Sequence, residues 1–328
     1  MRPITAITLS SVLFISLAVG QIITVRPSLP ELSAWIYPDD QSKNGRDEAE
    51  NTNLVTDDYL FDVSEVTRLS VSFNYMAGSL EIKAGASKQI KGAIKYDPEE
   101  FLPSAQYDVF GSKGVFKVKM ESLNSRHVYD NDTEGIDFKF GFRDFKNNKY
   151  SQEFDFQLPP AIPTDLKLEF ALGDADIDLS NLALTSLELE CGLSDVRLEI
   201  DKVNTTKCKE VYIESGLGDF NAYGLGLLRA EYFNLDVGLG SAYIDLSKQK
   251  SDLTGDIDVG LGSLELLLPE KANIKIRVDD SFLSSVDVDD MIKTGHKEWR
   301  TADWNKRWPS IEFDISIGLG SVDIDLVK

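Results

Sequence analysis

The sequence predicts an all-β protein folded as a single-stranded β-solenoid of about 22 residues per coil. A motif recurs along the chain: residues 238–246 read Gly-Leu-Gly-Ser-Ala-Tyr-Ile-Asp-Leu, with near-copies at 260–268 and 318–326. Its spacing is regular, because the central leucines from Leu172 to Leu261 are separated by 21, 24, 22 and 22 positions. Apolar residues alternate on both sides of each leucine, which is the period of a β-strand. Strands at a fixed phase in such a repeat are typical of stacked coils.

Residues 1–25 are expected to be a signal peptide or an N-terminal membrane anchor. Arg2 precedes an apolar run that ends in small residues suited to cleavage before Gln21. The alternative is a retained anchor through residues 4–25, because 23 uncharged residues separate Arg2 from Arg26 and about 20 are enough to span a bilayer. Both interpretations place the rest of the chain outside the cytoplasm, in the periplasm, at the cell surface or anchored to a membrane and facing outward.

Residues 26–65 are expected to be a flexible acidic linker, since prolines are followed by Asp, Glu, Asn and Ser with few groups to bury. The whole chain has a net charge of −21. Nucleic acids and anionic lipids would be repelled by this charge, so we do not expect either as a direct partner.

Residues 66–328 are expected to form the solenoid domain. A first coil at 68–84 is followed by a region, 85–165, in which the period is lost, and we expect additional, partly antiparallel strands there. Five uninterrupted coils follow at 165–268. An insertion at 269–310 separates them from the last coil, and we expect it to cap one end or flank. The extra strands are expected at 90–95, 107–110, 114–120, 136–140 and 153–158.

The Gly-Ser-Leu-Glu-Ile run at 78–82, the repeated Gly-Leu-Gly-Ser coils and a single N-terminal apolar segment resemble the bacterial toast-rack or "putative adhesin" family. That family is similar to the C-terminal domain of LiaF-like cell-wall-active antibiotic response proteins. The resemblance covers about residues 66–328. It implies an envelope-facing, non-enzymatic β-solenoid, and it supplies no catalytic residue and no cofactor. LiaF-like sensors carry several transmembrane helices ahead of this domain, whereas here only residues 4–25 have the length to span.

The insertion contains the candidate ligand-binding residues Trp299, Trp304 and Arg300. Residues 291–308 hold five basic residues against two acidic ones, a net charge of +3 within an acidic chain. Tryptophan faces stack on sugar rings or on a protein partner, which would make this segment a binding surface. The alternative is a cap, in which the tryptophans cover a coil end and the basic groups pair with outward aspartates.

Outward positions of the coils carry many carboxylates. Stacked strands lie about 4.8 Å apart, and two carboxylates at that distance repel by about 0.9 kcal/mol in water. The predicted columns are mixed, which favours a solvated surface. Calcium is the alternative, but it needs about six to eight oxygens around one point, and we predict no metal site. One such mixed column is Asp176, Arg197, Asn221, Tyr243 and Glu265.

The sequence offers no catalytic constellation. His127 and His296 are expected at the surface, Cys191 and Cys208 are expected to be buried thiols, and hydrolase elbows, P-loops and zinc pairs do not occur. The chain is therefore predicted to be a non-enzymatic envelope protein without a cofactor, acting by adhesion or protein contact on an envelope protein or a cell-surface glycan. The alternatives are an envelope-stress regulator that binds a membrane sensor kinase, and a glycan-active parallel β-helix enzyme. The oligomeric state is left open.

Overall fold

The computed structural model describes residues 54–123, 152–280 and 284–328. The expectations for residues 1–25, for most of the linker, for a strand at 136–140 and for His127 lie outside these residues.

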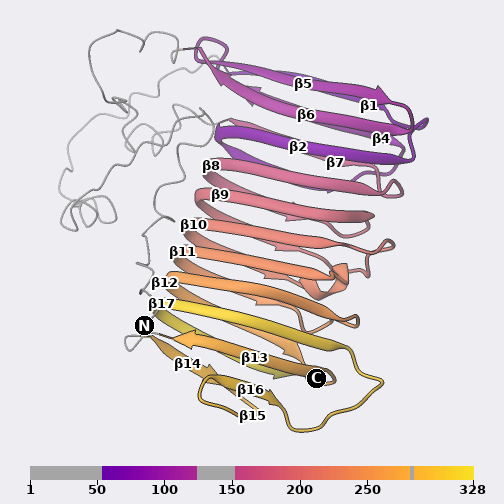
Figure 1. The fold of residues 1–328 in the computed structure, drawn as a ribbon. Helices are drawn as coiled ribbons and strands as arrows, with labels where there is room; N and C mark the ends of the chain where they lie inside the picture. The colour runs from indigo at the N-terminus through magenta and orange to yellow at the C-terminus, as the bar shows by residue number, and fades with distance from the viewer. Residues whose placement is uncertain (1–53, 124–151, 281–283) are drawn as a thin grey trace, which may run out of the picture.

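Six long parallel strands form the centre of the molecule and stack on one another like the bars of a rack (Figure 1). Their register keeps the repeated motif aligned from coil to coil, so that Leu172 lies opposite Leu193 and Leu239 opposite Leu261. This arrangement confirms the predicted solenoid and its coil length. The six strands are β8 (Thr164–Asp178), β9 (Leu184–Glu199), β10 (Glu210–Tyr223), β11 (Tyr232–Asp245), β12 (Leu253–Pro269) and β17 (Ser310–Val327).

Each long strand is divided into two halves by a three-residue motif at its middle, which we call the corner. The motif is Gly-Leu-Gly in β10, β11, β12 and β17, Ala-Leu-Gly in β8 and Gly-Leu-Ser in β9. At Gly240 the backbone has φ +156°, and a Cβ atom there would lie 2.0 Å from the carbonyl oxygen of Gly218 on the preceding coil. A side chain is therefore excluded by both conformation and space. The sheet presents a first-half face before the corner and a second-half face after it.

Inward side chains alternate as predicted and fill a continuous core. Leu and Ile side chains buried in this way stabilise the fold by about 1.5–3 kcal/mol each. The column four positions before the corner illustrates the regularity, because each member is at most 2% exposed. Its members are Leu168, Leu189, Ile213, Leu235, Ile257 and Ile315.

One coil departs from this pattern in a way that aromatic packing explains. Gly255 lies in register between Phe233 and Phe313. A Cβ atom at Gly255 would lie 1.8 Å from the carbonyl oxygen of Phe233. The two phenylalanine rings meet edge to face with their centroids 6.1 Å apart, so they fill the core of a coil that has no side chain of its own at this position.

The N-terminal end extends both halves of the sheet with shorter strands. The first coil is divided into β2 (Arg68–Ala77) and β3 (Ser79–Ala84), which both pair with β8. Beyond β2 lie β6 and β5, and beyond β3 lie β7, β4 and β1. Antiparallel pairs β1–β4, β4–β7 and β5–β6 occur here, as predicted. The bounds are β1 (Val55–Asp62), β4 (Gln89–Tyr96), β5 (Phe101–Phe110), β6 (Lys113–Ser122) and β7 (Glu153–Leu158).

Strand β1 falls within residues 26–65, which the sequence assigned to a flexible linker. The structure differs here because Tyr59 and Phe61 alternate with polar residues and pack their rings on the core, Phe61 lying 5.4 Å from Phe116 between centroids. Regular structure is therefore already present at Val55, ahead of the predicted boundary.

Residues of the insertion lie at the C-terminal end (Figure 1). Strands β13 (Asn273–Asp280) and β14 (Ser285–Val288) pair in parallel with β17, which itself pairs with β12. The last strand of the sequence therefore lies between β12 and the insertion. A small antiparallel unit, β15 (Met291–Lys293) and β16 (Glu298–Thr301), continues from β13. The described residues contain one short 3-10 helix, η3 (Leu225–Leu228).

Candidate functional site

The three residues predicted to bind a ligand have different environments. Trp299 on β16 lies opposite Ile276, is partly buried against the core, and has the Lys293 Nζ atom 4.7 Å from its ring centroid. Arg300 follows it and is exposed. Trp304 lies beyond the end of β16 and is 55% exposed. Trp299 thus covers the core, as the cap alternative requires, whereas Trp304 is exposed to solvent.

Basic groups around this segment also pair with nearby carboxylates. Lys297 Nζ lies 2.7 Å from Asp279 Oδ1, and Arg277 Nη1 lies 2.9 Å from Asp314 Oδ1. His296 is exposed in the turn between β15 and β16.

A column of five carboxylates runs along the first-half face and was missed by the sequence reasoning. Consecutive members lie opposite one another on adjacent parallel strands. Every member stands three positions before the central leucine of its coil, and that fixed offset is the signal that could have found it. The mixed column predicted on the second-half face is confirmed where Asp176 lies opposite Arg197, and that prediction did not extend to the first-half face. The carboxylate column consists of Glu169, Glu190, Glu214, Asp236 and Asp258.

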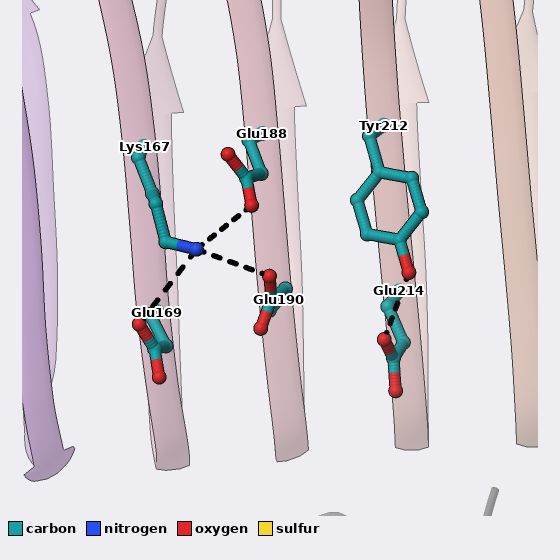
Figure 2. Close-up of polar contacts among 6 residues, drawn as sticks. All are labelled: Lys167, Glu169, Glu188, Glu190, Tyr212 and Glu214. Atoms are coloured by element: carbon teal, nitrogen blue, oxygen red, sulfur yellow. Dashed lines mark hydrogen bonds and ion pairs between the residues drawn. The ribbon is translucent and has the colours of Figure 1, made fainter. Parts of the chain in front are cut away.

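Lys167 compensates part of the negative charge at one end of the carboxylate column (Figure 2). Its Nζ atom lies 2.7 Å from Glu188 Oε1, 3.2 Å from Glu190 Oε1 and 3.9 Å from Glu169 Oε2. Burial alone would lower the pKa of Lys167, but its hydrogen bonds to Glu188 and Glu190 outweigh that effect and the pKa is raised. One ammonium group therefore lies among three carboxylates, which leaves this region with a net negative charge.

The negative charge of the carboxylate column is less compensated towards the middle of the column. Tyr212 donates a hydrogen bond of 3.0 Å to Glu214 Oε2 (Figure 2), which satisfies one oxygen but brings no charge. Asp236 is half-buried, and burial followed by repulsion from Glu214 and Asp258 raises its pKa from 3.8 to about 6. Burial likewise raises the pKa of Glu190. The column is therefore a surface of concentrated negative charge.

Two grooves lie beside these columns. A groove of about 680 Å³ on the second-half face is lined by Asp174, Asp195 and Asp219, with Lys95 and Arg197 also contributing. The other, of about 370 Å³, lies on the first-half face near the C-terminal end. Its lining includes the exposed Tyr232 together with Lys275, Arg277, Asp256 and Glu312. Both grooves present carboxylates and cations together, which suits polar partners.

Neither a metal centre nor a reactive thiol is formed by the residues that the structure describes. Within residues 54–123, 152–280 and 284–328, no group of three or more His, Cys, Asp or Glu is arranged to hold a metal ion. Cys191 and Cys208 are buried free thiols, and burial raises the pKa of each to about 12. These thiols are therefore protonated at neutral pH and are poor nucleophiles.

Fold and surface together define a class of protein: an open all-β rack of stacked parallel coils with columns of repeated side chains on its outer faces. Solved structures offer distant likenesses. A "putative cell adhesion protein" from Clostridium sporogenes is 18% identical with a TM-score of 0.42, covering 84% of this chain and 100% of its own. A "putative adhesin" from Bacteroides fragilis is 12% identical with a TM-score of 0.35, covering 83% and 97%.

The family is established by sequence. The model of the N-terminal domain of toast_rack (DUF2154) matches residues 43–223, more than half of the 328-residue chain. The chain belongs to the toast-rack family, which confirms the resemblance drawn from the repeated motif. No curated protein matches the chain. In the part of the chain that the structure covers, no helix has the length and apolar character needed to cross a membrane.

Proposed function

We propose that this chain is a non-enzymatic envelope protein, exported or anchored by its N-terminal apolar segment, that acts by adhesion or protein contact. The observation that carries the proposal is the repetition of outward side chains in register along successive coils, exemplified by the carboxylate column. Such a surface offers the same chemistry at many equally spaced points. It suits an extended partner that contacts several coils at once, which is how solenoids commonly bind.

Its charges support a binding role over glycan cleavage. A glycosidase needs one carboxyl group kept protonated and a second kept ionised across the scissile bond. Here Glu190 and Asp236 have raised pKa values because they are buried in a row of like charges. Every interior member of that row has a carboxylate on each side, so the row repeats one environment along the surface, whereas a glycosidase places its two carboxyl groups on either side of one scissile bond.

Export is supported by the sequence. The apolar residues 4–25 precede the folded part, and the net charge of −21 keeps the chain soluble and away from anionic surfaces. An envelope protein or a cell-surface glycan remains the proposed partner.

Photo-crosslinking on intact cells tests the proposal. A photoreactive amino acid replaces Tyr232, which is 56% exposed on the first-half face, or Phe110, which is 67% exposed on edge strand β5 and serves as the control position. A membrane-impermeant biotin reagent reports whether the chain is accessible from outside. We expect external labelling and a crosslinked envelope component from position 232.

Two results would contradict the proposal. Labelling only after the cytoplasmic membrane is opened would place the chain in the cytoplasm, and release of reducing sugars from wall polymers by the purified chain would make it an enzyme. A crosslinked sensor kinase would identify the regulatory alternative as the form that protein contact takes.

A further inference from the structure

The corner leucines form an outward apolar ridge. Neighbouring members lie opposite one another in the parallel register. None belongs to the buried core: Leu261 and Leu319 are 36% and 44% exposed, and the other four are half-buried. The corner leucines are Leu172, Leu193, Leu217, Leu239, Leu261 and Leu319.

Backbone geometry explains why the ridge protrudes. On either side of Leu239 the chain passes within contact distance of the preceding coil, so that a Cβ atom at Gly238 or Gly240 would lie 2.6 or 2.0 Å from a carbonyl oxygen. Both flanking positions are glycine in four of the six coils, where the leucine is the one side chain at its corner; Ala171 flanks Leu172 and Ser194 flanks Leu193 in the other two. With strands about 4.8 Å apart, the six leucines extend over about 24 Å.

Negative charge borders the ridge along five coils on its first-half side and along three coils on its second-half side. The carboxylate column runs along the first-half face, three positions before five of the six leucines, and Ser316 takes this position before Leu319. Two positions after the leucines come Asp174, Asp195 and Asp219, and the same position holds Ser241 and Ser263 in later coils. Ser241 donates a hydrogen bond to Asp219. An apolar strip with acidic borders is complementary to an apolar strip with basic borders.

Building on the proposed function, we propose that the ridge is the docking surface for a cationic amphipathic helix of a partner protein. About 16 helical residues have the length of the ridge at 1.5 Å per residue, and the helical pitch of about 5.4 Å is close to the spacing of the leucines. Apolar residues at helical spacing would thus follow the leucines while lysines or arginines on their flanks meet the carboxylates. A second copy of this ridge would set carboxylates against carboxylates, and an anionic lipid surface would also be repelled.

Binding of a synthetic peptide to the purified full-length chain tests this proposal. The probe is an 18-residue helix with leucines on one face and lysines elsewhere, measured by fluorescence anisotropy at several salt concentrations. We expect saturable binding that weakens with salt, and a Kd about tenfold or more higher for the double variant Leu239→Thr/Leu261→Thr. Leu267→Thr is the matched control, because Leu267 is partly exposed on the second-half face, opposite Asp245 and Asp325, and off the ridge.

Further measurements separate an effect of the substitutions on folding from an effect on peptide binding. Thermal unfolding of each variant verifies that it is folded, and Glu214→Gln/Asp236→Asn leaves every leucine in place while it should reduce the salt dependence of binding. A peptide with the same composition but no apolar face should bind at least about tenfold more weakly, and a glutamate version should not bind.

The proposal would be overturned if the lysine peptide with an apolar face and the peptide of the same composition without one bound equally well. Unchanged binding by a folded Leu239→Thr/Leu261→Thr variant would also overturn it. Such a result leaves the proposed function in place if position 232 still captures an envelope component on intact cells. Labelling only after the cytoplasmic membrane is opened would instead remove the proposed function whatever the peptide result.

Discussion

Replacing Asp236 by Asn should stabilise this protein at neutral pH. Asp236 lies in register between Glu214 and Asp258, and it is half-buried. A carboxylate about 4.8 Å away repels it by about 0.9 kcal/mol in water and by about 3.5 kcal/mol at an effective dielectric constant near 20. Burial, followed by repulsion from two such neighbours, accounts for a pKa of about 6 in place of 3.8.

The direction of the pH dependence follows from this raised pKa. The folded chain holds the proton of Asp236 more tightly than the unfolded chain does, so the free energy of unfolding decreases as the pH rises from about 4 to about 6. The difference between the two pKa values corresponds to about 3 kcal/mol at most, and screening by solvent reduces it to about 2 kcal/mol. Below about pH 4 both states are protonated and the cost disappears.

The assay is urea unfolding followed by circular dichroism at pH 7.5 and pH 4. Asp236→Asn should raise the free energy of unfolding by about 2 kcal/mol at pH 7.5 and leave it nearly unchanged at pH 4, and the gain should shrink in high salt. Asp256→Asn is the control: its register partners are Asn234 and the ion-paired Asp314, and we expect a change within about 0.5 kcal/mol. A destabilised Asp236→Asn variant at pH 7.5, or an equal gain at pH 4, would refute the reasoning.

The remaining predictions concern packing at the corner and in the core, and the tryptophans of the insertion at the C-terminal end of the sheet. Gly240→Ala should unfold the chain or cost more than about 3 kcal/mol in thermal denaturation, because its Cβ atom would lie 2.0 Å from the Gly218 carbonyl oxygen. A stable Gly240→Ala variant would contradict the tight corner. Phe233→Ala should cost about 3–5 kcal/mol, since it removes a fully buried ring that also fills the space at Gly255; a loss below about 1 kcal/mol would show that this contact is not formed. Trp299→Ala should lower the free energy of unfolding by about 1–2 kcal/mol and Trp304→Ala by less than about 0.5 kcal/mol. A larger loss for Trp304→Ala than for Trp299→Ala would show that Trp299 does not cover the core.

Much of the fold was predictable because aliphatic residues recur at a fixed phase in every coil. Alternation alone placed residues such as Leu235 and Ile257 on one inward column, and the structure buries both. Strand β1 was missed because only Tyr59 and Phe61 mark its inward side, in a segment otherwise rich in aspartate. The position of β17 between β12 and β13 could not be predicted from the sequence either. The order of segments in the chain does not show on which side of a strand an insertion will pair.

The ridge of corner leucines and the carboxylate column were harder to predict than the fold, because the corner interrupts the alternation of side chains. Regular alternation fixes which face a side chain occupies only while the strand is continuous. The positive φ at Gly240 breaks that phase, so the sequence pattern alone does not show that Leu239 protrudes. The carboxylate column lies before the corner, where the sequence reasoning considered only the inward residues. Its pKa effects depend on burial and on neighbours in adjacent coils, and both require the three-dimensional register.

Disulfide trapping measures most directly the parallel register on which the ridge, the carboxylate column and the binding proposal all depend. Asn221 and Tyr243 lie opposite one another on β10 and β11, at a strand spacing of about 4.8 Å that a disulfide can bridge. The double variant Asn221→Cys/Tyr243→Cys should therefore oxidise rapidly, while the buried Cys191 and Cys208 remain reduced. The offset pair Asn221→Cys/Asp245→Cys should not, because two further residues along the strand place its Cα atoms about 8 Å apart. Equal oxidation of both pairs, or preference for the offset pair, would contradict the register.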